Sequence, residues 1–355
     1  MIVLFFCFLL GLLLRIYLVI TLPVWFDEKV ALTLAQAPFI DVLLHSTDVA
    51  RPPLYYLFIK FWSLLSSHYL WFRFSSLLLF SINFFLIYRV GKNINGELFG
   101  RIASILYSFS GYFIIFDWQI KPYTGLLTCI LLVYWSMIQD KLNRGIFIFS
   151  VLVGLFFDFG FLYMFVPMFL YYVYLFLHKN REALFQVKML TVCILIFLMF
   201  MAIFPKDFER FIRETSWVGS YMDIRFTLPF FFGVSGAPFA VMPPAILWCI
   251  GVIRSYVSDG FISIKNYLFF AGYFAFIIAS IVSLVWIPIF HVRSLQIVGL
   301  CFLFGIAFAL KEIYLRLSYG KFIVIVILSI MLLNVLRVSY LVPVSPGLFL
   351  ISFSL

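Results

Sequence analysis

The sequence predicts an all-α polytopic membrane protein, a bundle of about eleven transmembrane helices with further helices at its outer surface. Hydrophobic residues make up 65% of the 355-residue chain and charged residues only 11%, whereas a soluble domain is roughly half apolar and about a quarter charged. The mean hydropathy is +1.14. Apolar runs of membrane-spanning length recur along the chain, separated by short loops that carry Lys and Arg.

The first apolar segment, residues 1–22, contains Arg15 and ends at Pro23. It lacks the basic start and the small-residue cleavage site of a secretory signal peptide. We therefore expect it to be retained as the first transmembrane span.

Short basic clusters predict the topology, because loops rich in Lys and Arg remain cytoplasmic. Five such clusters lie at residues 89–101, 139–144, 178–188, 254–265 and 311–321. Placing all five on one side requires an even number of crossings between neighbouring clusters. This condition predicts one integral-membrane domain, residues 1–355, with spans near residues 1–22, 71–90, 101–116, 122–138, 145–157, 161–177, 188–204, 238–254, 266–287, 294–310 and 322–341.

Two longer loops face the opposite, outer side. The first, residues 23–70, contains an apolar segment at 52–66 that is too short to span the bilayer and is interrupted by Lys60. We expect this segment to form a helix in the plane of the membrane surface, opened by two prolines. The second external loop, residues 205–237, has the pattern of a short surface helix.

Composition also excludes several classes of protein. The net charge is +10, but the basic residues punctuate apolar runs, so we expect them to set topology and predict no nucleic-acid partner. The five cysteines all lie inside apolar segments and none forms a C-x-x-C pair. They indicate small buried residues rather than a disulfide framework or a zinc site.

Asp27 and Glu28 directly follow the first span, where it leaves the membrane. Ionisable groups packed against membrane spans are costly and usually mark a working site. A carboxylate at this point can accept a proton from a hydroxyl group. Asp27 and Glu28 are therefore candidate site residues, although Asp27 could instead be a solvated carboxylate beside Lys29.

The external loop reads WFDEKVALTLAQAPFIDVLLHSTDVARPPLYYLFIKFW over residues 25–62. Its W-x-D-E and R-P-P-L-Y-Y elements resemble the first external loop of the GT-C glycosyltransferases that use polyprenyl-phosphate sugars. The similarity is to the bacterial branch related to protein mannosyltransferases and to the lipid A aminoarabinose transferase. Arg51 stands where that branch has His.

Three further elements are similar to the same family. The phrase L-R-I-Y around Arg15 resembles the family's L-R-x-Y, and residues 116–123 resemble its Y-S-Q-E-A-R-P-Y. Ile120 stands where the family has Glu in that second element, and Asp117 is the nearest carboxylate. The sequence F-H-V-R-S-L around Arg293 resembles the family's R-Y-L at an outer boundary.

The resemblance implies a GT-C-like bundle and an inverting transfer of sugar from a polyprenyl-phosphate donor. The acceptor would be a glycan, lipid or protein on the extracytoplasmic face of a bacterial inner membrane. The implied catalytic carboxylates are Asp27, Glu28 and Asp117, with Asp27 as the general base. Cations that would hold the departing phosphate are Arg51, Lys60, Lys121 and Arg293. Residues that would line the substrate cavity are Tyr55, Tyr56, Tyr123, His291 and Arg15. No cofactor is predicted, and a divalent metal stays open.

Structural roles stay open for several of these residues. Arg15 could snorkel towards the membrane surface, Asp117 and Lys121 could form an i,i+4 ion pair, and Arg293 could anchor a lipid headgroup. The paired tyrosines 55 and 56 could belong to the aromatic belt.

Two other classes of function are alternatives. A transporter or flippase of lipid-linked saccharides would need charged residues along a path across the bilayer and repeated halves. Here the charges gather at one face, and no repeat is evident. A structural membrane subunit is the third possibility.

Overall fold

The computed structural model describes residues 2–45, 51–139, 142–203, 238–260, 263–285 and 292–341, and within these ranges the chain is helical without strands. The predicted second external loop, residues 205–237, lies outside the described residues, and so does His291. The elements are α1 (Ile2–Thr21), α2 (Phe26–Gln36), α3 (Phe39–His45), α4 (Leu54–Ser63), α5 (Tyr69–Phe109), α6 (Gly111–Phe116), α7 (Tyr123–Met137), α8 (Arg144–Phe157), η2 (Phe159–Phe161), α9 (Leu162–Leu177), α10 (Ala183–Ile203), α13 (Pro238–Asp259), η4 (Ile264–Asn266), α14 (Tyr267–Val285), η5 (Val292–Ser294), α15 (Gln296–Arg316) and α16 (Gly320–Leu341).

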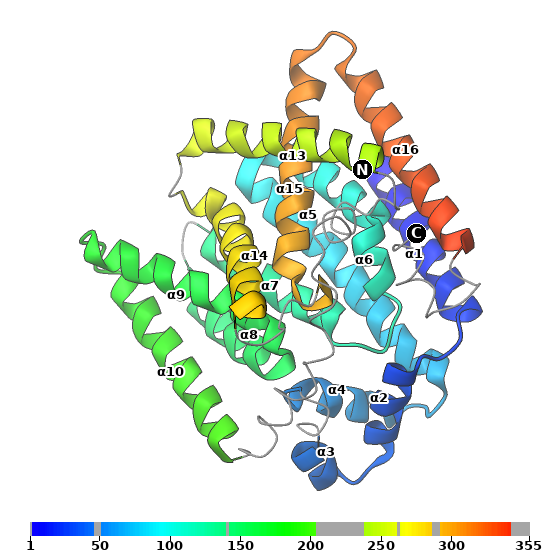
Figure 1. The fold of residues 1–355 in the computed structure, drawn as a ribbon, viewed down its shortest axis with the longest axis vertical. Helices are drawn as coiled ribbons and strands as arrows, with labels where there is room; N and C mark the ends of the chain where they lie inside the picture. The colour runs from blue at the N-terminus through cyan, green and yellow to red at the C-terminus, as the bar shows by residue number, and fades with distance from the viewer. Residues whose placement is uncertain are drawn as a thin grey trace.

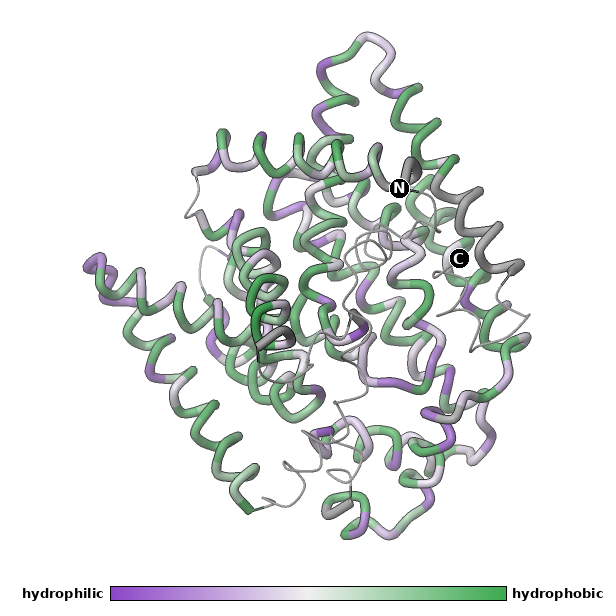
Figure 2. Tube along the Cα trace, viewed as in Figure 1, coloured by the Kyte–Doolittle hydropathy of each residue, from purple (hydrophilic) through white to green (hydrophobic). Residues whose placement is uncertain are grey.

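Several helices have the length and composition of membrane spans. Six segments of the described chain qualify, namely Ile2–Thr21, Tyr69–Phe109, Phe159–Leu177, Ala183–Ile203, Ile264–Ser283 and Gln296–Arg316. Figure 2 shows hydrophobic residues along most of these helices and hydrophilic ones at the tip joining α9 to α10 and around α2 to α4. The predicted all-α multi-pass membrane architecture is therefore confirmed at this level, while the count of about eleven spans stays a prediction.

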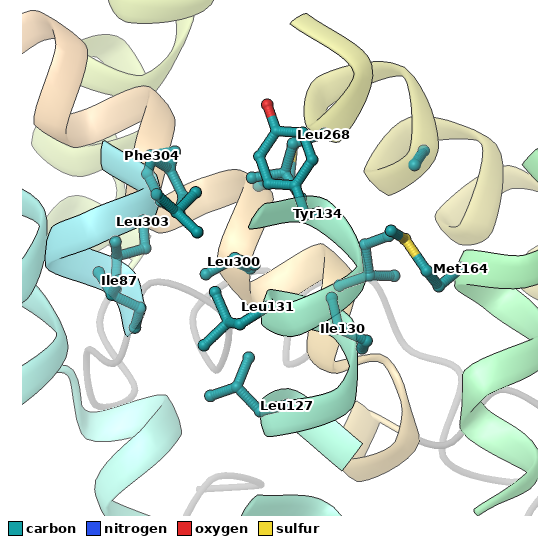
Figure 3. Close-up of a cluster of buried hydrophobic side chains, with 14 of the residues drawn as sticks. Ile87, Leu127, Ile130, Leu131, Tyr134, Met164, Leu268, Leu300, Leu303 and Phe304 are labelled. Atoms are coloured by element: carbon teal, nitrogen blue, oxygen red, sulfur yellow. The ribbon is translucent and has the colours of Figure 1, made fainter. Parts of the chain in front are cut away.

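The core of the bundle lies between α5, α7 and α15. Every residue of α15 from Gln296 to Leu310 is buried. Figure 3 shows Ile87 of α5, Leu127 and Leu131 of α7 and Leu300 of α15 within one cluster of buried side chains. Close packing of these side chains fixes the relative positions of the three helices.

The chain reverses its direction within α5. Asn95 and Gly96 have non-helical backbone angles, and Gly96 has a φ of 82°, a conformation that glycine adopts without strain. Beyond this turn Gly100 approaches the backbone of Tyr88, where a Cβ would lie 2.5 Å from the carbonyl oxygen, and Ser104 donates a hydrogen bond to the carbonyl of Phe84. The two halves therefore run antiparallel, which matches the predicted reversal at residues 89–101.

Helix α13 crosses α15 in Figure 1 instead of running beside it. At the crossing a Cβ on Gly251 would lie 1.8 Å from the carbonyl oxygen of Gly305, so the two backbones are in close contact. The six segments that qualify as membrane spans do not include this helix. The predicted span at residues 238–254 therefore stays a prediction.

Helix α4 is short, as the sequence predicts for the segment 52–66. Its ten residues give a length of about 15 Å, half the thickness of the hydrocarbon core. Its end is tied to the beginning of α5, because the indole nitrogens of Trp62 and Trp71 each donate to the other residue's carbonyl, at 2.8 and 3.0 Å. Their rings stack with centroids 5.1 Å apart. Helices α2, α3 and α4 gather at one end of the molecule (Figure 1).

Candidate functional site

Two adjacent carboxylates in the first turn of α2 face different environments. Pro23 follows the end of α1, and α2 begins at Phe26, so Asp27 and Glu28 stand at a helix N-terminus that favours negative charge. The Asp27 side chain is 40% exposed, whereas that of Glu28 is 1% exposed. The two acids therefore have different surroundings despite being neighbours in the chain.

Asp27 is held by two cations from distant parts of the chain. The Nζ of Lys121 lies 3.0 Å from its Oδ2, and Nη1 of Arg293 donates to the same oxygen at 3.2 Å, across a sequence separation of 266 residues. Burial opposes ionisation of the carboxylate, but Lys121 and Arg293 outweigh that effect and lower the pKa of Asp27 below its ordinary value. Asp27 is thus a carboxylate at neutral pH.

Arg51 forms the second part of the same site. Its guanidinium pairs with the carboxylate of Asp158, and its Nη2 donates to the hydroxyl oxygen of Tyr123 at 2.8 Å. The ring of Tyr123 is close to two arginines, with centroid distances of 5.2 Å to the Arg51 guanidinium carbon and 6.0 Å to that of Arg293. The structure therefore brings together Asp27, Lys121, Arg293, Arg51 and Tyr123, all of them predicted site residues.

Lys121 has an environment that makes its charge sensitive to pH. It lies in the turn between α6 and α7, and its side chain is 9% exposed. Burial lowers its pKa to about 7, the nearby Arg51 and Arg293 act in the same direction, and Asp27 opposes them. A new anion beside Lys121 would favour its protonated form.

Arg15 and Asp117 form a separate buried pair, which corrects their predicted placement in the site. Nη2 and Nε of Arg15 donate to Oδ2 of Asp117 at 2.8 and 3.1 Å, and both side chains are at most 1% exposed. Nη1 of Arg15 also donates to the carbonyls of Gly11 and Ser108. Arg15 therefore neither snorkels nor lines a cavity, and Asp117 pairs with Arg15 instead of with Lys121.

The reason lies in the local backbone. Helix α6 ends at Phe116 and α7 begins at Tyr123, so residues 117–122 form a turn and not a continuous helix. The i,i+4 geometry needed for an Asp117–Lys121 pair is absent. The turn directs Asp117 to the interior beside α1 and Lys121 to Asp27.

Tyr55 and Tyr56 are buried, contrary to the prediction that they stack on a sugar or lie in an aromatic belt. Their exposures are 2% and 3%, and the Tyr55 ring packs against those of Tyr56 and Phe157.

Lys60 also differs from its predicted role as a phosphate ligand. Its ammonium donates to the carbonyls of Ala35 and Ala37 at the end of α2, a favourable position for a cation.

Two important residues were not among those predicted for the site. Asp158, in the turn after α8, accepts from Arg51, and Arg73 at the beginning of α5 pairs with Glu28. The available signal was their position, because both are ionisable residues at the end of an apolar segment. The sequence offered no means of matching either residue to its partner.

The five ionisable side chains carry three positive and two negative charges when all are ionised: Arg51, Lys121 and Arg293 against Asp27 and Asp158. The site therefore has one excess positive charge and favours an anion. Within the described ranges no three His, Cys, Asp or Glu side chains gather as a metal site would require. No protein-family model and no curated protein matches this sequence.

Proposed function

We propose that this protein is a membrane glycosyltransferase that moves a sugar from a polyprenyl-phosphate donor to an acceptor hydroxyl, with inversion at the anomeric carbon. The observation that carries the proposal is the pairing of Asp27 with both Lys121 and Arg293. A carboxylate base and phosphate-binding cations are the two elements that this reaction needs. The resemblance of the external loop to that of the GT-C enzymes favours the same activity.

In the proposed reaction the acceptor oxygen attacks the anomeric carbon as the bond from that carbon to the phosphate oxygen breaks. The acceptor proton passes to Asp27, and the lipid phosphate leaves with the bonding electrons. Arg51, Lys121 and Arg293 stabilise the negative charge that develops on the phosphate. Asp27 later releases its proton to water.

The charges of the site match this sequence of events. With all five groups ionised the site has an excess charge of +1, which complements the single negative charge of a sugar phosphodiester. Protonation of Asp27 raises that excess to +2 as the leaving lipid phosphate becomes a dianion. Charge complementarity is therefore kept on both sides of the transfer.

The cations around Asp27 explain how a carboxylate with a lowered pKa can serve as a base. A phosphate that takes contacts from Lys121 and Arg293 weakens the interaction of these cations with Asp27. The pKa of Asp27 then rises from its lowered value. The carboxylate becomes a stronger base only when donor is bound. Near the same end of the molecule, Phe61, Leu64 and Leu65 of the α4 region are exposed apolar residues suited to contact with lipid chains.

Purified protein incubated with a polyprenyl-phosphate sugar labelled in the sugar tests the proposal. We expect label to appear in an acceptor and free polyprenyl phosphate to form in equal amount. Movement of the intact labelled donor across a vesicle membrane, without cleavage of the sugar–phosphate bond, would favour the transporter instead.

A further inference from the structure

The turn that follows α8 contacts the side chain of Arg51 and the backbone beside Arg293. Asp158 lies at its beginning with a side-chain exposure of 3%. One carboxylate oxygen, Oδ2, accepts from Nη1 of Arg51, and the other, Oδ1, accepts from the backbone N–H of Gly160 at 2.7 Å. The two oxygens therefore have separate tasks, one holding Arg51 and the other closing the turn.

Gly160 brings the same turn against the segment that carries Arg293. A Cβ on Gly160 would lie 2.6 Å from the carbonyl oxygen of Ser294 and 2.8 Å from the Leu126 side chain. Such distances leave no room for a side chain, so the turn packs directly on the backbone of η5, one residue from Arg293. Leu126 belongs to α7, which begins at Tyr123.

These contacts join the turn to Arg51, to the segment that carries Arg293 and to helix α7. Arg51 is held by the Asp158 carboxylate, Gly160 packs on the backbone of Ser294 next to Arg293, and both guanidinium groups lie near the ring of Tyr123. A phosphate that bridges both arginines requires a fixed separation between them, because each charged hydrogen bond is sensitive to distance and angle.

We infer that Asp158 is a positioning residue that holds Arg51 beside Tyr123, so that Arg51 and Arg293 can act on one phosphate group. The identity of the ligand rests on the function proposed above, whereas the contacts of Asp158 do not. Asp158 does not touch the reacting atoms, and its effect passes through Arg51. A helix-turn cap alone would require only the oxygen that accepts from Gly160.

Asparagine and glutamate at this position separate the two tasks. Asp158→Asn keeps an oxygen for the N–H of Gly160 but presents an uncharged group to Arg51. Asp158→Glu keeps the charge. Glu97→Gln is the matched control for loss of one negative charge, since Glu97 pairs with Arg101 on an exposed helix surface.

The experiment measures donor KM and kcat for these variants, together with the Kd for polyprenyl phosphate as a probe and the unfolding temperature in detergent. Asp158→Asn should raise the donor KM and the probe Kd by about tenfold or more, the usual effect of losing a charged hydrogen bond. Its kcat should change by less than about threefold, and Asp158→Glu should recover most of the affinity. Glu97→Gln should match the unmodified protein.

A fall in kcat with unchanged donor KM and probe Kd in Asp158→Asn would overturn the inference and leave Asp158 a structural cap. If Asp158→Asn does not fold, Asp158→Glu and Gly160→Ala decide: Gly160→Ala should weaken probe binding, and equal binding would overturn the inference. If the unmodified protein binds the probe but transfers no sugar, the proposed reaction fails while the Asp158 comparison still stands. Absence of probe binding by the unmodified protein would overturn both.

Discussion

Glu28 and Arg73 form a buried ion pair that joins four separate segments at the site end of the molecule. Nε and Nη2 of Arg73 donate to the two carboxylate oxygens of Glu28 at 3.0 and 2.7 Å. Glu28 also accepts from the backbone N–H groups of Trp25 and Ile120, and Arg73 donates to carbonyls at the end of α1, including that of Val19. This pair fixes the backbone from which Asp27 projects.

Arg73→Met should destabilise the protein, because it leaves the Glu28 carboxylate buried without its cation. Breaking a buried pair by removing one partner costs about 3–5 kcal/mol. We expect a clear fall in the unfolding temperature in detergent. Asp27→Asn is the control and should unfold near the temperature of the unmodified protein, since Asp27 is partly exposed. Equal unfolding temperatures for Arg73→Met and the control would contradict this role.

Donor binding should depend on pH through Lys121. At pH below about 7 its ammonium is already charged in the free protein, so binding of an anion takes up no proton and affinity is constant. Above that pH, binding an anion beside Lys121 requires protonation, so affinity should fall by up to about tenfold per pH unit. Titration with a lipid phosphodiester between about pH 6 and 9 measures the slope.

Lys121→Arg separates charge from titration, because arginine stays protonated over this range. We expect the variant to bind the phosphodiester with little dependence on pH. Asp27, Arg51 and Arg293 are the charged groups that face Lys121. A slope in Lys121→Arg equal to that of the unmodified protein would assign the titration to another group.

Arg293→Ala should weaken donor binding more than acceptor binding, since the proposed contact of Arg293 is with the phosphate. The loss of one charged hydrogen bond corresponds to about 1.5–3 kcal/mol. Isothermal titration with donor and acceptor separately gives the comparison. Arg316→Ala is a matched control, because Arg316 pairs with Glu312 near the end of α15, on an exposed surface. Unchanged donor affinity in Arg293→Ala would return this residue to lipid anchoring.

The orientation of the bundle can be tested with two exposed serines, Ser67 before α5 and Ser318 after α15. In Figure 1, α4 lies at one end of the molecule and the turn that joins α15 to α16 lies at the opposite end. If the candidate site faces outward, Ser67→Cys should react with a membrane-impermeant thiol reagent in intact cells. Ser318→Cys should react only after permeabilisation, with unmodified protein as the background. The reverse pattern would place the site in the cytoplasm.

The sequence allowed the coarse architecture to be predicted because its signals are local. Hydropathy identifies long apolar helices, and the short segment 52–66 with Lys60 indicates a helix that cannot span. Asp27 is recognisable from its position after the first span. The reversal inside α5 is likewise marked by basic residues and Gly96.

The sequence did not predict which side chains pair across the fold. Arg293 meets Asp27 across 266 residues, and Arg15 meets Asp117 across 102. Such contacts depend on how helices pack and on how turns direct side chains, which a hydropathy pattern does not encode. The turn at residues 117–122 illustrates this, since a helix there would have paired Asp117 with Lys121, and the turn separates them.

The most direct test of the central claim is sugar transfer by Asp27→Asn, which keeps the size of the side chain but cannot accept a proton at neutral pH. Purified unmodified protein and variant are compared with saturating labelled donor, and Glu97→Gln serves as the control for loss of one charge. We predict that turnover in Asp27→Asn falls by about 10²–10⁴, the usual contribution of a general base, while donor affinity is kept or increases. Turnover equal to that of the unmodified protein would contradict the assignment of Asp27 as the base.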